Sequence, residues 1–271
     1  MPSYVSTVNL MKTAAAVTAS SEQSGYEDNH LREPEYRGEP WRSTGTTEQT
    51  IVIDHGQAKS MGRIVLIGAN FGLFSVQQHT ADSWATPDYD SGPIAVTRDP
   101  DHRLYRRWFE RAPLTPLTLR FTRIVIPGSQ TPFDGAAHYE IAGIFMTSDL
   151  LALPRGCRPR YEVGIIDPRE IVEAESGFSV AYQLDDQPIA VQRWIRQATK
   201  NPMNPGVDDE LGEWRDIDRA IAAAGGQFCY FVDHWGTSAA WIMNQTNQSA
   251  WKDLDLVHAE DSWDLTEATA G

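Results

Sequence analysis

The sequence predicts a mainly β protein with one helix in its second half. Segments rich in alternating or β-branched residues recur at 50–54, 63–67 and 117–126, and Gly, Pro, Asn and Asp separate them. Apolar residues at helical spacing are almost absent before residue 150. Many short strands with turn residues between them favour a β-sandwich or a barrel.

The first half contains three more expected strands, at 14–19, 73–77 and 139–146. Residues 20–49 and 80–101 are polar and rich in turn-forming residues, so we expect long loops there. Together these segments predict a strand-and-loop domain without helices.

The strand pattern is interrupted at 151–160, where two prolines, a glycine and three arginines follow one another closely. We therefore predict one domain at 1–150 and a smaller one at 151–271. The helix is expected at about 208–224, because acidic residues occupy its first turn and apolar residues recur every three or four positions from Leu211 to Ala224. Antiparallel strands are expected around it, at 165–172, 177–183, 189–198, 227–233, 239–243 and 254–258.

Composition excludes several classes of protein. The net charge is −14 and the sequence pI about 4.8, with no basic stripe, which disfavours binding to nucleic acid.

No apolar stretch approaches the roughly 20 residues of a membrane span, and the Ala-rich run after Lys12 is too short for a signal peptide. Cys157 and Cys229 form no zinc motif, so they are either one disulfide or two free thiols. We expect a soluble protein made in the cytoplasm.

Three segments of the first half resemble the discoidin or coagulation-factor C-type domain. They are residues 41–45 (WRSTG), 49–56 (QTIVIDHG) and 63–67 (RIVLI). The resemblance covers roughly residues 13–148 and implies a galactose-binding-like β-sandwich, or jelly roll. Asp54 would accept backbone hydrogen bonds at a strand end, Gly56 would permit a tight turn, and Trp41 would cap the sandwich.

A wider resemblance concerns the whole chain. Residues 139–145 (YEIAGIF) and the unit of helix, glycine and aromatic strand at 214–233 look like segments of bacteriophage tail proteins. The resemblance implies a structural subunit of a distal tail or baseplate. Such a subunit would be synthesised in the host cytoplasm and would join the virion tail as a homo-oligomeric ring, with other tail proteins as further partners.

Four residues are candidates for binding a ligand. Asp28 and Asn29 lie in the first long loop and Trp84 in the second, while Trp41 lies near the first loop in sequence. Polar oxygens and aromatic faces suit a sugar, so the alternative function is a carbohydrate-binding module that attaches to a bacterial surface glycan, such as one of the host. Late aromatic residues serve either the core or an interface between subunits: Trp235, Trp241, Trp251 and Trp263.

Catalysis is not predicted, and neither is a cofactor or a bound metal. The chain lacks a nucleophile motif, a phosphate-binding loop and a zinc-protease motif. His138 and Glu140 would face the same side of a strand and could share a metal or a proton, but no third ligand is nearby and a surface pair is favoured. Asp233 and His234 have no Ser or Cys to activate, which favours a turn at a strand end.

Overall fold

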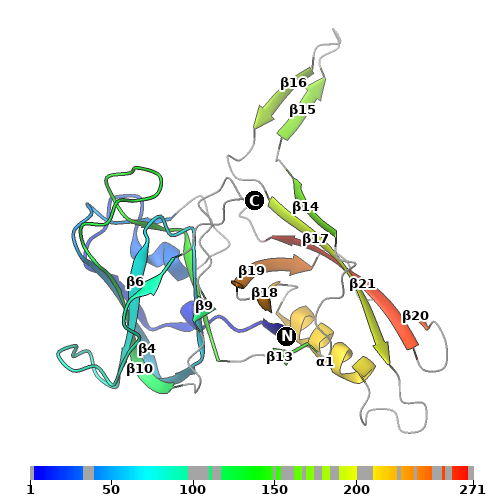
Figure 1. The fold of residues 1–271 in the computed structure, drawn as a ribbon, viewed down its shortest axis with the longest axis horizontal. Helices are drawn as coiled ribbons and strands as arrows, with labels where there is room; N and C mark the ends of the chain where they lie inside the picture. Colours follow the sequence, from blue (N-terminus) through cyan, green and yellow to red (C-terminus); the bar gives the residue numbers. More distant parts are fainter. Residues whose placement is uncertain are drawn as a thin grey trace.

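The computed structural model describes residues 3–32, 40–96, 110–111, 117–148, 151–153, 162–166, 169–173, 179–183, 189–199, 210–224, 227–234, 237–245, 252–253 and 258–267. It confirms the mainly β fold class: strands dominate these residues, and they include one α-helix. Two groups of sheets lie side by side, the first built mostly from the first half of the chain and the second mostly from the second half (Figure 1).

The larger sheet of the first group follows the expected alternation of buried and solvent-facing residues. Its order is β2 (Ala16–Ala19), β4 (Gln49–Met61), β10 (Leu117–Ile126), β6 (Leu73–His79) and β7 (Tyr89–Asp90), and β8 (Ile94–Ala95) pairs with β6. In β10, Thr122, Ile124 and Ile126 are buried while their neighbours are partly exposed. One face of this sheet therefore supplies the core and the other faces solvent.

A second sheet faces the first and completes the sandwich. It consists of β12 (Gly143–Thr147), β5 (Arg63–Ile67) and β9 (Glu110–Arg111). The two sheets enclose one hydrophobic cluster, to which the first sheet gives Ile51, Phe74 and Ile124 and the second gives Leu66 and Ile144. A short pair, β3 (Trp41–Arg42) with β11 (Glu140–Ile141), and two 3₁₀ turns, η1 (Leu10–Thr13) and η2 (Asp28–Arg32), close the edge.

Strand β4 continues beyond the segment that the sequence predicted. The strand does not end at Asp54 but passes through an irregular bulge, in which residues 55–58 lie opposite Arg120 between the pairs Asp54↔Phe121 and Lys59↔Leu119. Asp54 accepts a hydrogen bond from the backbone of Gly56 (2.7 Å), and Gly56 has a φ of +75°. The roles expected for these two residues are therefore confirmed, but within a bulge that bends the strand rather than at its end.

The segment predicted as one strand at 139–146 is split into β11 and β12 at Ala142. The backbone N–H of Ala142 donates to Ile67 (2.8 Å), and Gly68 approaches Ala142 so closely that a Cβ on Gly68 would lie 2.7 Å from the Cβ of Ala142. This close approach redirects the chain from one strand to the next, an effect that periodicity cannot reveal.

The second group is an eight-stranded sheet with one helix. The path runs β13 (Leu151–Ala152), β1 (Ser3–Ser6), β18 (Gln227–His234), β19 (Thr237–Gln245), β21 (His258–Glu267), β17 (Ile189–Thr199) and β14 (Glu162–Ile166), and β20 (Lys252–Asp253) pairs with β21. Helix α1 (Glu210–Ala223) contacts β17 and β18. Its predicted apolar face is confirmed at Trp214, Ile217 and Ile221, which are buried, but not at Ala224, which is exposed at the end of the helix.

The chain enters the second sheet at its very beginning, a feature that the sequence did not indicate. Strand β1 pairs with β18 from Ser3↔Val232 to Ser6↔Cys229, and with β13 on its other side. The sandwich is thus inserted between β1 and β13. The predicted division at 150/151 places Ser3–Ser6 in the first domain, whereas this strand belongs to the second sheet.

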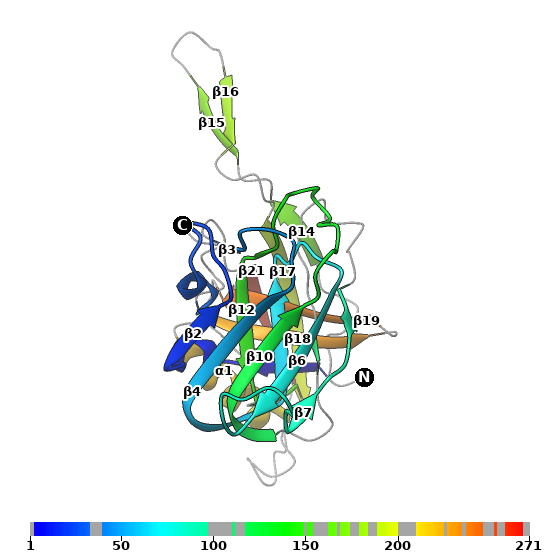
Figure 2. The same ribbon diagram turned by 90° about the vertical axis from the view of Figure 1, so that its left-hand side faces the viewer.

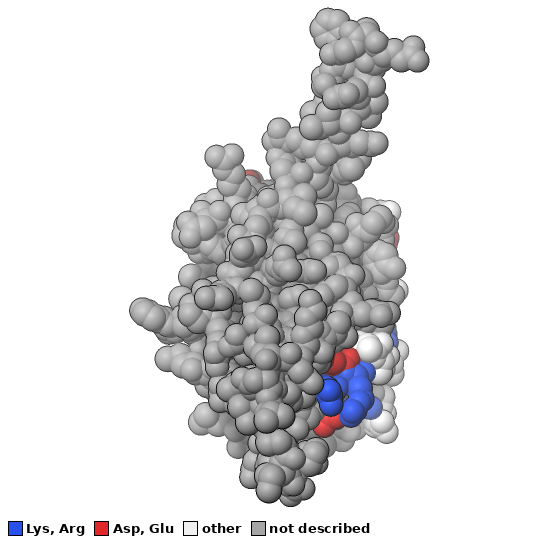
Figure 3. Space-filling model, turned by 90° about the vertical axis from the view of Figure 1, so that its right-hand side faces the viewer, with Lys and Arg blue, Asp and Glu red and all other residues white. Residues whose placement is uncertain are grey.

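The segment predicted as one strand at 165–172 is divided between β14 and β15 (Arg169–Glu173). Strand β15 pairs with β16 (Ser179–Gln183) in a hairpin that is a sheet of its own and projects from the body (Figures 1 and 2). The solvent face of α1 carries both signs of charge, including Glu213, Arg215 and the ion pair Asp216–Arg219. In Figure 3, blue and red atoms lie side by side in a small patch at the lower right.

Candidate functional site

The predicted ligand residues lie at opposite ends of the sandwich. Trp41 in β3 is at the end where β4 begins, since Ser21 accepts a hydrogen bond from the indole of Trp41 (3.2 Å) and donates to Gln49 (2.7 Å). Trp84 follows β6, whose last residue His79 pairs with Phe121 beside the bulge of β4. A single site cannot contain both tryptophans.

The side chain of Trp41 is not accessible to a ligand. Its side chain is 0% exposed and its indole N–H is bonded to the Ser21 carbonyl. Asp28 holds the first loop on the sandwich, because its carboxylate accepts a hydrogen bond from the backbone of Ala19 (2.9 Å). Asn29 is exposed beside it. Trp41 thus supports the sandwich, which accords with the capping role that the resemblance implied.

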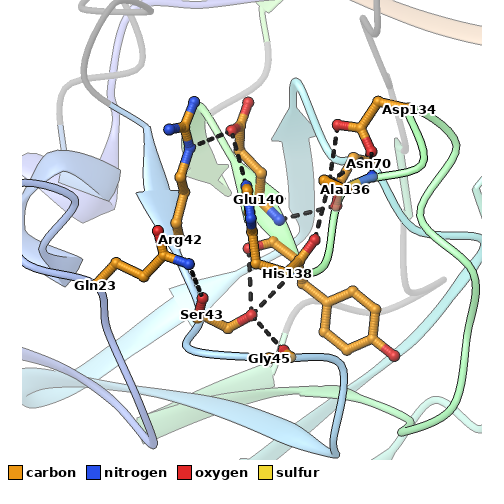
Figure 4. A network of polar contacts seen from close by, with 10 residues as sticks. Gln23, Arg42, Ser43, Gly45, Asn70, Asp134, Ala136, His138 and Glu140 are labelled. Carbon is orange, nitrogen blue, oxygen red and sulfur yellow. Dashed lines mark hydrogen bonds and ion pairs between the residues drawn. The ribbon is translucent and has the colours of Figure 1, made fainter.

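Next to this loop, four partly exposed side chains form a cluster that we call the loop-end array: Tyr26, Arg42, His138 and Glu140. The Arg42 Nε donates to Glu140 Oε2 (2.6 Å), and His138 Nε2 is 3.8 Å from the same oxygen. The Arg42 guanidinium lies over the Tyr26 ring, 3.9 Å from its centroid. Figure 4 shows Arg42, His138 and Glu140 converging on one place.

Asn70 fixes the strand that carries Glu140. Its amide N–H₂ donates to the Asp134 carboxylate (3.1 Å) and to the His138 carbonyl (3.2 Å), and its side-chain oxygen accepts from the Glu140 backbone (2.8 Å). Asn70 is buried, with 1% of its surface exposed, and Figure 4 shows its bonds to Asp134 and to the segment from His138 to Glu140. A buried amide with every polar group engaged holds its neighbours rigidly.

Ser43 and Tyr139 fix the opposite strand in the same way. The Ser43 hydroxyl accepts from the Tyr139 backbone (2.8 Å) and donates to the Gly45 carbonyl (2.7 Å), while Gln23 donates to the Ser43 carbonyl (2.9 Å). Tyr139 is fully buried, and its hydroxyl donates to Thr46 (3.0 Å). Arg42 and Glu140 are therefore presented by a pair of strands whose backbone is fixed on both sides.

The loop-end array presents polar groups that are partly exposed to solvent. Among the described residues, the two terminal nitrogens of Arg42 have no hydrogen-bond partner, and its side chain is 29% exposed. Glu140 and His138 are 24% and 21% exposed. Together they present donors and acceptors in fixed directions beside an aromatic ring, which is the combination that orients small polar ligands.

The sequence pattern indicates only part of this array, the pair of His138 and Glu140. Arg42 gave no signal, because it is 98 positions away from Glu140. The expectation that His138 and Glu140 would share a strand face was also incomplete, because His138 precedes β11. Within the described residues no group of three or more His, Cys, Asp or Glu is arranged to hold a metal ion.

At the other end, Trp84 is held by its neighbours but remains partly exposed. Its indole N–H donates to Asp82 (2.6 Å), its ring lies 4.6 Å from the Arg123 guanidinium, and it meets His79 edge to face with 6.4 Å between centroids.

Of the candidate interface residues, Trp241 lies in β19 and Trp263 in β21, while Trp235 and Trp251 fall outside the described residues, as does Cys157. No helix in the described part of the chain is long and apolar enough to cross a membrane.

Comparison with known proteins gives similar solved structures only. No family model matches, and no curated protein matches significantly. A chitosan-binding module from a chitosanase/glucanase of Paenibacillus sp. IK-5 is 17% identical, with 52% of this chain and 99% of that one covered and a TM-score of 0.37. A family 32 carbohydrate-binding module of NanJ from C. perfringens, solved with galactose, is 10% identical, with 53% and 98% covered and a TM-score of 0.40.

A fucose-binding module of Streptococcus pneumoniae is 11% identical, with 52% of this chain and 98% of that one covered and a TM-score of 0.37. These modules each match about half of this chain. Nothing in the comparisons supports a place in a phage tail.

Proposed function

We propose that the sandwich is a non-catalytic glycan-binding domain whose site is the loop-end array. The observation that carries the proposal is the Arg42–Glu140 pair, held by a buried polar network and leaving the Arg42 terminal nitrogens free among the described residues. Sugar hydroxyls both donate and accept hydrogen bonds, so adjacent guanidinium and carboxylate groups suit a pair of them. Tyr26 adds an aromatic surface beside these groups.

The charges at this end favour a neutral or cationic sugar over an acidic one. Arg42 is matched by Glu140, and Asp134 adds a carboxylate next to the array. Glu22 and Glu27 are further acids of the first loop, where they accept backbone hydrogen bonds from Asp28 and Gly25. A sialic or uronic acid would meet repulsion from these carboxylates.

Calorimetry with a panel of neutral, amino and acidic mono- and oligosaccharides tests the proposal. Arg42→Ala and Glu140→Gln should each weaken binding on the order of tenfold or more, because each leaves a partner without its bond. Arg219→Ala is the matched control, since Arg219 is also an arginine paired with a carboxylate but lies on α1. The proposal is wrong if no sugar binds, or if the Arg42 and Glu140 variants bind as well as the native protein.

A second candidate function is self-assembly into a ring, as the resemblance to phage tail proteins implies. The feature that favours it is the hairpin β15–β16, which pairs only within itself among the described strands and projects from the body (Figure 2). A two-stranded hairpin is marginally stable by itself in water, so contact with another copy would stabilise it. The tail, its other proteins and the virion stay predictions of the sequence.

Light scattering on the purified chain tests self-assembly. A mass of several protomers that falls to one protomer when residues 169–183 are replaced by a short Gly/Ser linker supports the ring. A mass of one protomer for the native chain at all concentrations up to the millimolar range contradicts it. Neither outcome bears on glycan binding by the loop-end array.

A further inference from the structure

The outer face of the sheet β2–β4–β10–β6–β7 is a second surface with the character of a binding site. In Figure 2 this sheet lies at the front of the molecule, with the strands β4, β10 and β6 side by side. Three residues that point outward from it are only partly exposed: Gln77, Phe121 and Arg123. They are packed against one another rather than extended into solvent.

One row of planar polar groups crosses three strands of this face. Arg123 of β10 lies opposite Gln77 of β6, which lies opposite Asp90 of β7. The Arg123 Nε donates to the Gln77 side-chain oxygen (2.9 Å), and a terminal nitrogen of Arg123 donates to the same oxygen. The Gln77 amide in turn donates to Asp90 (2.7 Å). Side chains connected in this way lose little conformational entropy when a ligand binds.

An aromatic ring lies at the end of this row. Trp84 stacks on the Arg123 guanidinium at 4.6 Å, and its N–H is already bound to Asp82 (2.6 Å). His79 supports it from the side, while the backbone N–H of Ala81 donates to His79 Nδ1 (2.9 Å). The ring is therefore fixed in direction although the loop that carries it is at the surface.

A second stack of a cation on an aromatic ring occupies the neighbouring row. Phe121 lies between Asp54 and His79 in the register, and the Arg120 guanidinium is 4.8 Å from the centre of its ring. Arg120 also makes two hydrogen bonds of 2.8 Å to Asp54. We call the residues of both rows the outer-face platform: Gln77, His79, Trp84, Asp90, Arg120, Phe121 and Arg123.

We propose that the outer-face platform binds an extended, uncharged polysaccharide chain, independently of the loop-end array. Neighbouring strands are about 4.8 Å apart, so the rows offer hydrogen-bonding groups and rings at repeated intervals across the sheet. The two arginines face four carboxylates, those of Asp54, Asp82, Asp88 and Asp90, which disfavours an acidic chain. Because Trp84 and the loop-end array lie at opposite ends of the sandwich, one molecule can hold two glycan segments.

Retardation in native gels that contain a neutral linear polysaccharide tests this proposal, with barley β-glucan, xylan, hydroxyethyl cellulose and linear dextran as the probes. The native protein should be retarded by at least one of them. Trp84→Ala and Gln77→Ala should each weaken binding roughly tenfold, the size expected for loss of a central contact. Trp84→Phe should retain part of the binding, and unfolding curves should confirm that each variant is folded.

The variant Arg42→Ala separates this proposal from the proposed function. Retardation that is lost in Trp84→Ala and kept in Arg42→Ala supports the outer-face platform, whether or not small sugars bind the loop-end array. Retardation that persists in both Trp84→Ala and Gln77→Ala overturns the platform, and so does retardation that is lost only in Arg42→Ala. Absence of retardation by all four polysaccharides also overturns it and leaves the loop-end array untouched.

Discussion

The two sheets of the sandwich differ in how many of their faces are buried. In β10 the residues from Phe121 to Ile126 alternate between partly exposed and buried. In β12, from Gly143 to Thr147, every residue is buried. The first sheet therefore has an open face, and the second has none among the described strands.

The rest of the chain accounts for this difference. Phe145 and Val65 are buried although they do not belong to the core cluster between the sheets, so they are covered from outside. The N-terminal segment runs along this side: Ser6 is 2.8 Å from the Thr147 hydroxyl, and the Arg63 guanidinium lies over the Tyr4 ring. One sheet thus joins the sandwich to the second half of the chain, whereas the other keeps an open face among the described strands.

The largest effect is expected from removing an aromatic side chain on the covered sheet. Phe145→Ala should lower the free energy of unfolding by about 3–5 kcal/mol, since Phe145 is 5% exposed and its loss leaves a cavity. Phe121→Ala on the open face should cost about 1 kcal/mol, because that ring is already partly in solvent. Urea unfolding of both variants measures the difference. Equal losses would contradict the distinction between the sheets.

A glycine of the covered sheet should tolerate substitution less well than one beside the open sheet. Both Gly68 (φ +65°) and Gly92 (φ +62°) have left-handed backbone, but only Gly68 would place a Cβ against another residue, 2.7 Å from Ala142. Gly68→Ala should cost about 3 kcal/mol and Gly92→Ala about 1 kcal/mol in the free energy of unfolding. Thermal unfolding of the two variants compares them directly. A smaller loss for Gly68→Ala would refute the close approach.

Acid should lower the free energy of unfolding through His55, which lies on the buried face of the open sheet. Burial lowers the pKa of His55 to about 4, and its Nε2 is 3.2 Å from the Thr122 hydroxyl. Because the folded-state pKa is below the unfolded value of about 6.5, this contribution is complete above pH 6.5 and is lost as the pH falls through 6.5 towards 4.

By pH 5 the loss should reach about 2 kcal/mol of the free energy of unfolding. Urea unfolding between pH 7.5 and 4.5 measures it, and His55→Gln should flatten the curve in that window. An unchanged pH dependence in this variant would assign the acid sensitivity to other groups.

The smallest effect concerns an ion pair on the open face. Arg120 lowers the pKa of Asp54 to about 2 through its hydrogen bonds, so the contribution of the pair is present above the unfolded pKa of about 3.8 and lost as the pH falls through 3.8 to 2. The Arg120 side chain is 45% exposed, so solvent screening limits the coupling to less than about 1 kcal/mol. A double-mutant cycle with Asp54→Asn and Arg120→Gln measures the coupling, and a value of several kcal/mol would contradict the exposed geometry.

Strand positions followed from the sequence where local pattern decides them. The predicted bounds 63–67 and 117–126 agree with β5 and β10, and the apolar face of α1 is as predicted at Trp214, Ile217 and Ile221. Alternation and helical spacing report which residues are buried, and burial selects the strand or the helix. The polar segment after Asp261 continues β21 to Glu267 because it pairs with β17 and, at its end, with β19, which no local pattern reveals.

The two proposed binding surfaces depended on tertiary structure more than the strand positions did. The sequence by itself determined the mainly β class and several strand positions, because these follow from residue type and periodicity, whereas the predicted loops 20–49 and 80–101 also contain β3, η2, β7 and β8. Only the folded chain brought Arg42 to Glu140 and Arg123 to Gln77, and only the fold buried Trp41 while leaving Trp84 at the surface. Those pairs are 98 and 46 positions apart in sequence, and antiparallel register, which is a non-local property, decides which distant residues become neighbours.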